Sequence, residues 1–294
     1  MTAAADRYCP VLIAGQGLAG SLLALALEEE GIAACVLDPG NGDAASLAAA
    51  GSLNPCPSRS YGSPAPLDDW LPVATRTWSA IAERLDRPLI RSQPLIRLFR
   101  SADDAVQVRR RRTADPAVAV VLSEPLRGQP PGCAGAPGHV RIHAWQVDLP
   151  GFLAATRAWL LARGRLLTGR LSSGPLPQSL DGRLRVPVGT STIETQALVL
   201  AEGAAGTSRP ELAHLPWRLS RGDAVILDGA GRLPDQALRR QLALHPLGDG
   251  RHWLGSSYRR LSAPEHDPGT GDALLARLSE LLDIAGIEGA SVAR

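Results

Sequence analysis

A glycine-rich segment near the start of the chain constrains the fold more than any other feature. The apolar run 11–13 is followed by Gly15-Gln-Gly-Leu-Ala-Gly20, by a run of good helix formers and by a second apolar run that ends at Asp38. This order predicts a strand, a tight turn, a helix and a second strand, which together form the βαβ unit that binds dinucleotides. A glycine-rich turn without a ligand is the alternative, and the flanking runs disfavour it.

Each glycine of the turn has a separate expected role. Gly15 permits the tight turn out of the strand, Gly17 lets the backbone approach a pyrophosphate, and Gly20 lets the helix pack close to the strand. Asp38 lies 18 residues after Gly20, where its carboxylate can accept hydrogen bonds from ribose hydroxyls. The expected cofactor-binding residues of this unit are Gly15, Gln16, Gly17, Leu18, Ala19, Gly20 and Asp38.

The basic residues exclude several kinds of chemistry. Lysine and arginine together number 31, and all of them are arginine. The chain therefore has no lysine for a Schiff base, for pyridoxal phosphate or for a P-loop, and arginine is a poor proton shuttle because it stays charged. The formal net charge of +2 indicates neither nucleic acid nor an anionic membrane as the main partner.

The cysteines indicate a reduced, intracellular protein. None of Cys9, Cys35, Cys56 and Cys133 forms a CxxC pair, and no histidine stands at metal-ligand spacing from them, so no metal site is expected. The glycine turn interrupts the first apolar run, unlike a signal peptide. No apolar stretch is long enough to span a bilayer, and we expect a cytoplasmic protein.

The rest of the chain predicts a mixture of helices and short strands. Trp78 falls on the apolar face of a helix and is expected in the core. Asp148 is the expected N-cap of a later helix that has Pro150 in its first turn. Helices are predicted at 43–50, 67–85, 146–164 and 272–282, with 103–112 as a solvated helix face. Strands are predicted at 94–100, 117–122, 139–143, 165–171, 184–188, 190–197, 197–203, 218–228, 241–245 and 251–258.

Four segments in this order resemble one family. They are the glycine motif with Asp38, Ser46-Leu-Ala-Ala-Ala-Gly-Ser-Leu-Asn-Pro55, Ala197-Leu-Val-Leu-Ala-Glu-Gly203 and Trp253-Leu-Gly-Ser-Ser-Tyr258. Together they resemble the D-amino-acid-oxidase-like group (glycine oxidase and sarcosine oxidase) of FAD-dependent oxidoreductases, from about residue 9 to the end of the chain. The first two segments are the specific ones, and the others support them.

The resemblance implies a fold, a cofactor and a reaction. The implied fold is α/β, with a Rossmann-like FAD-binding domain interleaved with an antiparallel-sheet substrate domain. The FAD-binding domain would comprise residues 1–85 and 139–210, and the substrate domain 86–138 and 211–294 with a closing helix. The implied reaction oxidises a C–N bond of an amine or amino acid by hydride transfer to flavin, so the expected partner is a small molecule.

The resemblance also implies further site residues. The family segment that passes close to the flavin, and the glycine that follows the strand under it, carry over to Ser46, Ala50, Gly51, Ser52 and Gly203. Tyr258 could point its hydroxyl at the substrate. An aromatic residue at a solvent-exposed edge of the sheet, with no role in the site, is an equally good interpretation. No catalytic residue is assigned, because four histidines are candidates only by type: His143, His214, His245 and His252.

The sequence departs from the family pattern in two respects. Family members continue past the last helix with an Arg-Pro segment and a glycine-rich turn that complete the flavin site, whereas this sequence stops at Arg294. We therefore expect a member without that segment, whose flavin site a partner chain could complete. Oxidases of the family often place a lysine near the flavin, and its absence favours a dehydrogenase or a slow oxidase.

Three other interpretations are weaker. A nicotinamide-dependent dehydrogenase with a simple Rossmann domain is disfavoured by the Pro-rich loop 55–66 and the β-rich middle of the chain. A non-catalytic or degenerate flavoprotein-like subunit or fragment is supported by the absent C-terminal segment. RNA binding rests only on Arg109–Arg112, and a solvated helix face explains that run more simply.

Overall fold

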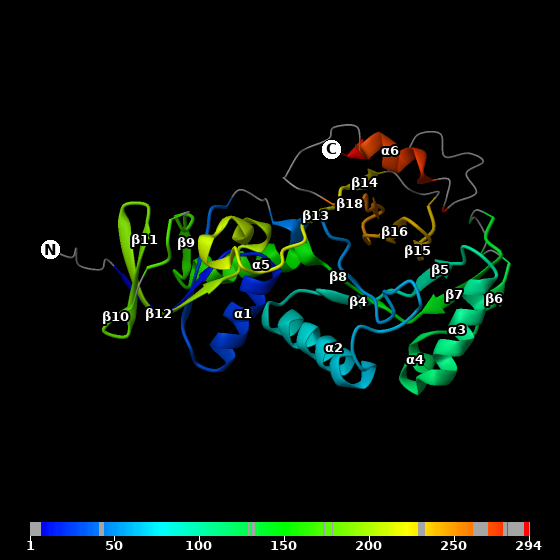
Figure 1. Cartoon of the computed structure of the whole chain (residues 1–294), viewed down its shortest axis with the longest axis horizontal. Helices are drawn as coiled ribbons and strands as arrows, with labels where there is room; N and C mark the ends of the chain where they lie inside the picture. Colours follow the sequence, from blue (N-terminus) through cyan, green and yellow to red (C-terminus); the bar gives the residue numbers. More distant parts are fainter. Residues whose placement is uncertain are drawn as a thin grey trace. The chain divides into compact units, whose positions relative to one another are not determined.

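Each of two units in the chain is built from two separate stretches of sequence (Figure 1). Unit 1 combines residues 1–49 with 148–219, and unit 2 combines 50–147 with 220–294. The computed structural model describes residues 7–40, 44–128, 130, 133, 135–172, 174–177, 179–228, 233–260, 270–278, 281 and 291–293. The mixture of parallel and antiparallel sheets with helices confirms the predicted α/β class. The sequence analysis instead assigned residues to an FAD-binding domain and a substrate domain, and those domain boundaries stay a prediction.

Unit 1 contains the predicted βαβ unit. Its elements are β1 (Arg7–Ala14), α1 (Leu18–Glu29), β2 (Ala34–Asp38), the 3₁₀ helix η1 (Ala45–Leu47), α5 (Leu149–Ala162), β9 (Leu166–Thr168), β10 (Ser179–Leu180), β11 (Arg183–Val188), β12 (Ser191–Leu200) and the 3₁₀ helices η2 (Gly203–Ser208) and η3 (Pro210–Leu212). The described strands form one sheet in the order β10-β11-β12-β1-β2-β9. The strands β12, β1, β2 and β9 are parallel, while β10 and β11 are antiparallel additions at one edge.

The two helices of unit 1 pack on the same face of this sheet. Ile13 and Val36 of the sheet lie in one buried cluster with Ala24 of α1 and Leu160 of α5. The predicted N-cap of α5 is confirmed, since the Asp148 side chain accepts a hydrogen bond from the first turn of the helix, but residues 146–147, predicted within this helix, belong to the strand β8 (Trp145–Val147). This packing fixes the start of α1 and the end of β2 next to each other, where the glycine motif and its acidic residue lie.

Unit 2 is built on a larger sheet. Its elements are β3 (Ser52–Leu53), α2 (Leu67–Arg84), β4 (Ile90–Ser92), β5 (Leu95–Leu98), α3 (Asp103–Ala114), α4 (Pro116–Val121), β6 (Leu126–Arg127), β7 (Gly138–Ile142), β8 (Trp145–Val147), β13 (Ser220–Arg221), β14 (Ala224–Asp228), β15 (Ala237–Arg239), β16 (Ala243–Pro246), β17 (His252–Gly255), β18 (Arg259–Arg260), α6 (Thr270–Ala276) and β19 (Ser291–Ala293). The described strands form a sheet in the order β19-β14-β17-β16-β15-β5-β7-β6, together with the smaller groups β3-β8-β4 and β13-β18.

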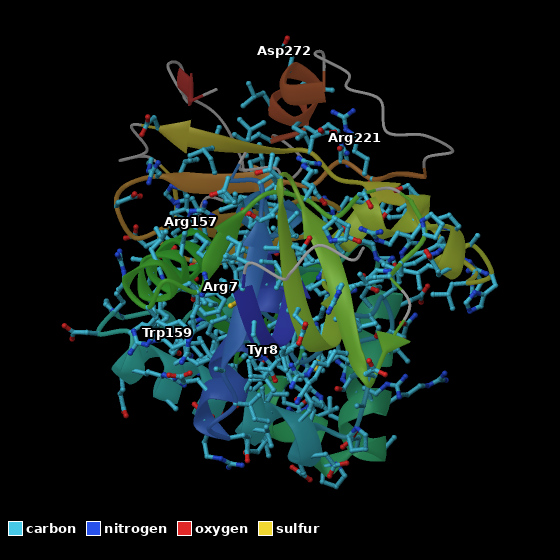
Figure 2. All side chains as sticks on the ribbon, turned by 90° about the vertical axis from the view of Figure 1, so that its left-hand side faces the viewer. Arg7, Tyr8, Arg157, Trp159, Arg221 and Asp272 are labelled. Atoms are coloured by element: carbon cyan, nitrogen blue, oxygen red, sulfur yellow. The ribbon has the colours of Figure 1, made fainter. Side chains whose placement is uncertain are left out.

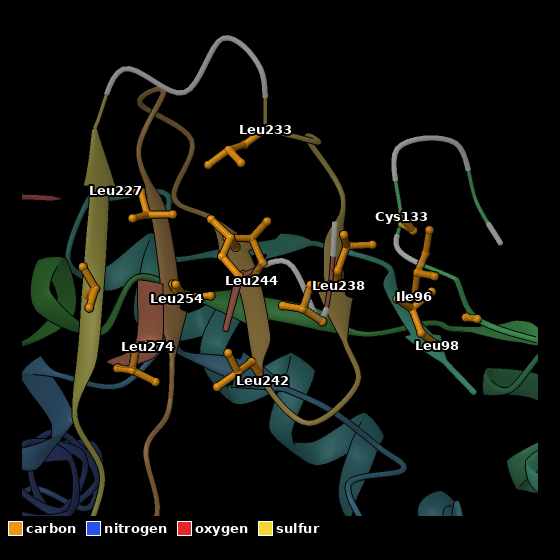
Figure 3. Packing of buried hydrophobic residues seen from close by; sticks show 14 residues of the cluster. Ile96, Leu98, Cys133, Leu227, Leu233, Leu238, Leu242, Leu244, Leu254 and Leu274 are labelled. Carbon is orange, nitrogen blue, oxygen red and sulfur yellow. The ribbon is translucent and has the colours of Figure 1, made fainter. Parts of the chain in front are cut away.

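The two faces of the larger sheet carry different side chains. One face is filled by aliphatic residues of neighbouring strands, including Ile96, Leu238, Leu244 and Leu254, and Leu274 of α6 packs against them (Figure 3). The other face carries Leu95 and Ala237, which pack into a second cluster with the helices α2, α3 and α4. Side chains alternate along each strand, so every residue of β5, β15 and β16 belongs to one of these faces.

Several local predictions are confirmed and others are wrong. The helix over 67–85 is present as α2 with Trp78 buried, and the charged segment 103–112 lies within α3. The strand predicted at 117–122 is the helix α4, because Asp115 caps its N-terminus and Pro116 occupies its first position. The two strands predicted over 190–203 are one strand, β12, and the helix predicted at 43–50 is only the short η1 among described residues.

The last described helix and the lengths of the helices complete the description. The closing helix predicted at 272–282 begins two residues earlier and ends at Ala276, and Leu282 lies outside the described residues. None of the described helices is both long enough and apolar enough to cross a membrane.

Candidate nucleotide-binding site

Two of the three motif glycines are required by the fold itself. Gly15 has a φ of +108°, and a Cβ atom there would overlap the carbonyl oxygen of Ala201 just beyond β12. A Cβ atom at Gly20 would overlap the carbonyl oxygen of Gly15. Glycine at these positions therefore permits the turn and the close packing of α1, as the sequence predicts.

Gly17 differs from the other two glycines because the protein leaves space beside it. Its backbone is extended, with φ −81° and ψ −167°, a conformation open to any residue. The nearest atom to a Cβ built there is the Ser46 hydroxyl oxygen, 3.9 Å away. Nothing in the described chain demands glycine here, and the open space leaves the backbone accessible to a ligand.

The N-terminus of α1 presents backbone donors at this open position. Gly17 is the N-cap residue and has no side chain to accept their hydrogen bonds. The Leu18 N–H donates to the Ser46 hydroxyl over 3.2 Å. Free N–H groups and the helix dipole make such an end favourable for a phosphate group. The structure thus brings Gly17, Leu18 and Ser46 together, and their contact with a nucleotide stays a prediction.

Asp38 lies at the end of β2 and already holds the turn in place. Its Oδ2 atom accepts from the Gln16 N–H over 3.1 Å, and its Oδ1 atom accepts from the Gly40 N–H over 2.8 Å. The side chain keeps 20% of its surface exposed. A carboxylate offers about four acceptor positions, so it can accept a ribose hydroxyl while keeping these bonds. The position fits the expected role and adds a structural one.

Arg157 is a residue of this site that the sequence analysis missed. It projects from α5 (Figure 2), and its Nη1 atom lies 3.1 Å from Asp38 Oδ1 and 3.0 Å from Gln16 Oε1. Gln16 in turn donates from Nε2 to the Leu153 carbonyl of α5 over 2.9 Å. Arg157 therefore fixes both the carboxylate and the turn residue that precedes Gly17.

The second predicted segment starts in unit 1 with Ser46 and continues into unit 2 from Ala50. Gln146 Nε2 donates to the Ala50 carbonyl over 3.0 Å, and the Val147 N–H donates to the Gly51 carbonyl over 2.8 Å. Gly51 has a φ of +70°, and a Cβ there would overlap the Val147 carbonyl oxygen. Ser52 pairs with Gln146 between β3 and β8. These contacts give the segment a defined shape, and its expected contact with flavin stays a prediction.

The remaining predicted positions have distinct surroundings. Gly203 follows β12 with a φ of +57° and open space around its Cβ position. Beside it, the Glu202 carboxylate pairs with the Arg209 guanidinium, whose Nη2 lies 2.7 Å from Oε1, a contact that the sequence analysis missed. Tyr258 is 71% exposed between β17 and β18, and its substrate role stays a prediction.

A protein-family model matches almost the whole chain. The model of the FAD dependent oxidoreductase family matches residues 10–293. The chain belongs to this family of FAD-dependent oxidoreductases. No curated protein matches the sequence.

Solved structures of other FAD-dependent oxidoreductases share the fold. Glycine oxidase from Geobacillus kaustophilus is similar with a TM-score of 0.76 and 20% identity, over 94% of this chain and 79% of that one. Iminodiacetate oxidase from Chelativorans sp. BNC1 is similar with a TM-score of 0.72 and 18% identity, over 97% and 81%. L-α-glycerophosphate oxidase from Mycoplasma pneumoniae, solved with FAD bound, has a TM-score of 0.73 and 14% identity, over 97% and 81%.

The residues of unit 1 fit the dinucleotide part of the family cofactor. The open space at Gly17 and the donors of α1 suit the pyrophosphate, and the spare acceptor capacity of Asp38 suits a ribose hydroxyl. No group of three or more His, Cys, Asp or Glu side chains in the described part of the chain could hold a metal ion.

Proposed function

We propose that this FAD-dependent oxidoreductase oxidises a C–N bond of an amine or amino acid. The open position at Gly17, between two glycines that the fold requires, is the observation that carries the assignment of FAD to unit 1. The names of the similar structures, glycine oxidase and iminodiacetate oxidase among them, support a small amine or amino acid as substrate. Bound FAD would supply the hydride acceptor for the substrate carbon next to nitrogen, and hydrolysis of the imine product would need only water.

The proposal gives the residues of this chain binding and orienting roles. Gly15, Gly17 and Gly20 shape the turn, the N–H groups of Ala19 and Gly20 face the pyrophosphate beside Leu18, whose N–H donates to Ser46, and Asp38 holds a ribose. Gln16 and Ser46 position these groups through the hydrogen bonds described above. The proposal also assigns Ala50, Gly51, Ser52 and Gly203 to contacts with the cofactor, and Tyr258 to the substrate side. No residue is assigned a proton-transfer role.

The first experiment asks whether the chain carries FAD and uses it. We would purify it without added cofactor, record the visible spectrum, and identify any chromophore released by heat. A panel of amines and amino acids is then added anaerobically. Bleaching of the flavin absorption by at least one compound is expected. FAD that is retained but never reduced would favour a non-catalytic flavoprotein-like subunit, and a chain that does not take up FAD would contradict the proposal.

A matched pair of glycine substitutions tests the role of Gly17. Gly17→Ala should weaken FAD binding at least about tenfold, since the added methyl group lies where the pyrophosphate approaches. Gly174→Ala is the control, because its Cβ position also has only a serine hydroxyl nearby, 3.9 Å away in the same unit. Both variants should keep the wild-type Tm. Equal FAD affinity in the two variants would refute the proposed contact between Gly17 and the pyrophosphate.

Two finer assignments belong to the same proposal. All four cysteines are free and buried, which supports a cytoplasmic location. The proposal includes a partner chain that completes the flavin site, and the FAD content of the chain purified alone tests it. A stoichiometric FAD content with full reducibility by substrate would make such a partner unnecessary.

A further inference from the structure

Two of the four cysteines lie close together in unit 1. Cys9 is near the start of β1, and Cys35 is near the start of β2, the neighbouring parallel strand. Both belong to one buried cluster, on the face of the sheet opposite α1 and α5, and they are 2% and 3% exposed. The glycine motif follows the other end of β1. The two thiols therefore form a feature separate from the candidate nucleotide-binding site.

The thiol of Cys9 has three hydrogen-bond acceptors within reach. Its Sγ atom lies 3.1 Å from the Val11 carbonyl oxygen and 3.9 Å from the carbonyl oxygen of Ala33, just before β2. The third acceptor is the Cys35 sulfur. A thiol has only one proton to donate, and an ionised acceptor binds it more strongly than a carbonyl does. When Cys35 is a thiolate, Cys9 therefore donates to its sulfur.

Two arginines place positive charge beside Cys35. Arg7, at the start of β1 (Figure 2), donates a hydrogen bond to the Cys35 sulfur, and its Nη2 atom also donates to the Gly164 carbonyl over 2.5 Å. Arg165 is bonded to β2 through its backbone, since its carbonyl accepts from the Val36 N–H over 2.8 Å. Its side chain is 26% exposed and pairs with Glu28, and its charge still acts on Cys35.

These contacts favour the ionised form of Cys35. The hydrogen bond from Cys9 lowers the pKa of Cys35 to about 7 although burial opposes it, and the two guanidinium charges add to the lowering. About half of the Cys35 side chains are then thiolates at pH 7. Burial raises the pKa of Cys56 to about 11 and also raises the pKa of Cys133, so both stay protonated. The thiolate is the reactive form of cysteine, and Cys35 supplies it.

We propose that a peroxide oxidises Cys35 and that Cys9 then closes a disulfide between β1 and β2. The Cys35 thiolate attacks one oxygen of hydrogen peroxide, the O–O bond breaks, and the departing hydroxide takes up a proton. This step leaves a sulfenic acid on Cys35. The Cys9 sulfur attacks the sulfenic sulfur, the S–O bond breaks, and hydroxide leaves with the Cys9 proton as water. Two thiols thus lose two electrons and two protons, and one peroxide becomes two water molecules.

The contact between the two sulfurs favours a reversible disulfide over further oxidation. A sulfenic acid that has a second thiol beside it condenses with that thiol, whereas an isolated one can react with more peroxide. Thiol reductants reopen a disulfide by exchange. The disulfide would close a loop over residues 10–34, which contain the glycine turn and α1. This inference does not depend on the proposed substrate or on bound FAD.

The first test follows the thiols of the reduced full chain in hydrogen peroxide at pH 7. Free thiols, counted after quenching and denaturation, should fall from four to two. The intact mass should fall by two hydrogen atoms, a peptide map should join Cys9 to Cys35, and a dithiol reductant should restore all four thiols. Four retained thiols, added oxygen without a disulfide, or a disulfide that includes Cys56 or Cys133 would overturn the inference.

Serine substitutions assign the roles of the two thiols. Cys9→Ser keeps a hydroxyl donor beside Cys35, and it should accumulate a sulfenic acid that dimedone labels at Cys35. Cys35→Ser should keep its remaining thiols in the same peroxide. Cys56→Ser is the matched control, because it removes a buried thiol from the other unit, and it should form the disulfide at the wild-type rate. Loss of thiols in Cys35→Ser would contradict the assigned roles.

The pH dependence of the rate distinguishes an activated thiolate from two thiols that are merely close. The rate of disulfide formation should rise with pH around a midpoint near 7, below the value of about 8.5 for an ordinary thiol. Arg7→Gln should slow the reaction at pH 7 about fivefold, the loss of thiolate for a rise of about one pH unit in the pKa of Cys35. Arg183→Gln is the control, since Arg183 pairs with Glu194 elsewhere in unit 1. A midpoint above 8, or equal rates for the two variants, would refute the role of Arg7 and of the thiolate.

Thermal unfolding shows whether the disulfide fits the folded chain. A disulfide compatible with the native structure restricts the unfolded chain, so the oxidised protein should have a Tm equal to or above that of the reduced protein. A lower Tm would mean that the disulfide distorts unit 1, and the inference would fail. Thiol counting needs no cofactor, so a chain that forms this disulfide without taking up FAD would keep the inference and contradict the proposed function.

Discussion

The folded chain keeps the His245 imidazole neutral, so lowering the pH should reduce the free energy of unfolding. The side chain is 4% exposed, and burial, followed by the charge of Arg239, lowers its pKa from 6.5 to about 4. In the unfolded chain the same ring takes up a proton below its ordinary pKa. The stabilisation is therefore complete above pH 6.5 and is lost as the pH falls from about 6.5 to about 4.

The magnitude follows from the two pKa values. The difference between 6.5 and about 4, at roughly 1.4 kcal/mol per pH unit, gives a loss of about 3 kcal/mol in the free energy of unfolding. That is a large part of the stability of an ordinary domain. Carboxylates such as Asp104, whose pKa is lowered by its bonds to Arg100, also lose stabilisation in acid, but at lower pH.

The assay compares urea unfolding of the wild-type chain and of His245→Gln between about pH 7.5 and pH 4. The difference between the two free energies of unfolding should change by about 3 kcal/mol across this window, because the glutamine side chain does not titrate. Titration of the imidazole followed by NMR should show no protonation of His245 down to about pH 5. Arg239→Gln should raise the pKa of His245. A ring that titrates near 6.5 in the folded chain, or parallel pH profiles for the two proteins, would refute this reasoning.

Three further substitutions test particular contacts. Arg157→Gln should weaken FAD binding about fivefold by releasing Asp38 while Tm stays nearly constant, and unchanged affinity by flavin fluorescence titration would contradict it. Glu202→Gln leaves the guanidinium of Arg209, which is 4% exposed, without its charged partner, and the free energy of unfolding should fall by about 3 kcal/mol in urea titrations. Asp115→Ala removes the N-cap of α4 and should cost about 1 kcal/mol by the same assay, which an unchanged urea midpoint would disprove.

The parts of the fold that sequence predicted well are those that short-range chemistry determines. The strand, turn and helix around Gly15–Gly20 lie within one continuous segment, and Gly20 has a steric reason inside that segment, because a Cβ there would overlap the Gly15 carbonyl oxygen. The start of α5 was equally clear, because Asp148 and Pro150 are both N-terminal signals. The strand predicted at 117–122 was wrong, because its apolar valines suggest a strand while Asp115 and Pro116 just before it start a helix.

The residues that sequence could not supply come together through distant pairings. Arg157 lies 119 residues from Asp38 in sequence, and only the packing of α5 beside the βαβ unit joins them. Arg97 and Arg239 meet because β5 and β15 are neighbours in the larger sheet. In a chain whose basic residues are all arginine, composition alone does not show which of them lie side by side, and the register of the strands does.

The glycine motif therefore reflects both the fold and the proposed nucleotide binding, and its sequence alone does not separate the two. Gly15 and Gly20 are needed by the turn and by helix packing whether or not a nucleotide binds, so their presence indicates a βα fold. Gly17 meets no steric demand from the described chain, and the proposed approach of a nucleotide to its backbone is the reason that we give for it. Substitution of Gly17 therefore tests nucleotide binding, whereas substitution of Gly15 or Gly20 tests folding first.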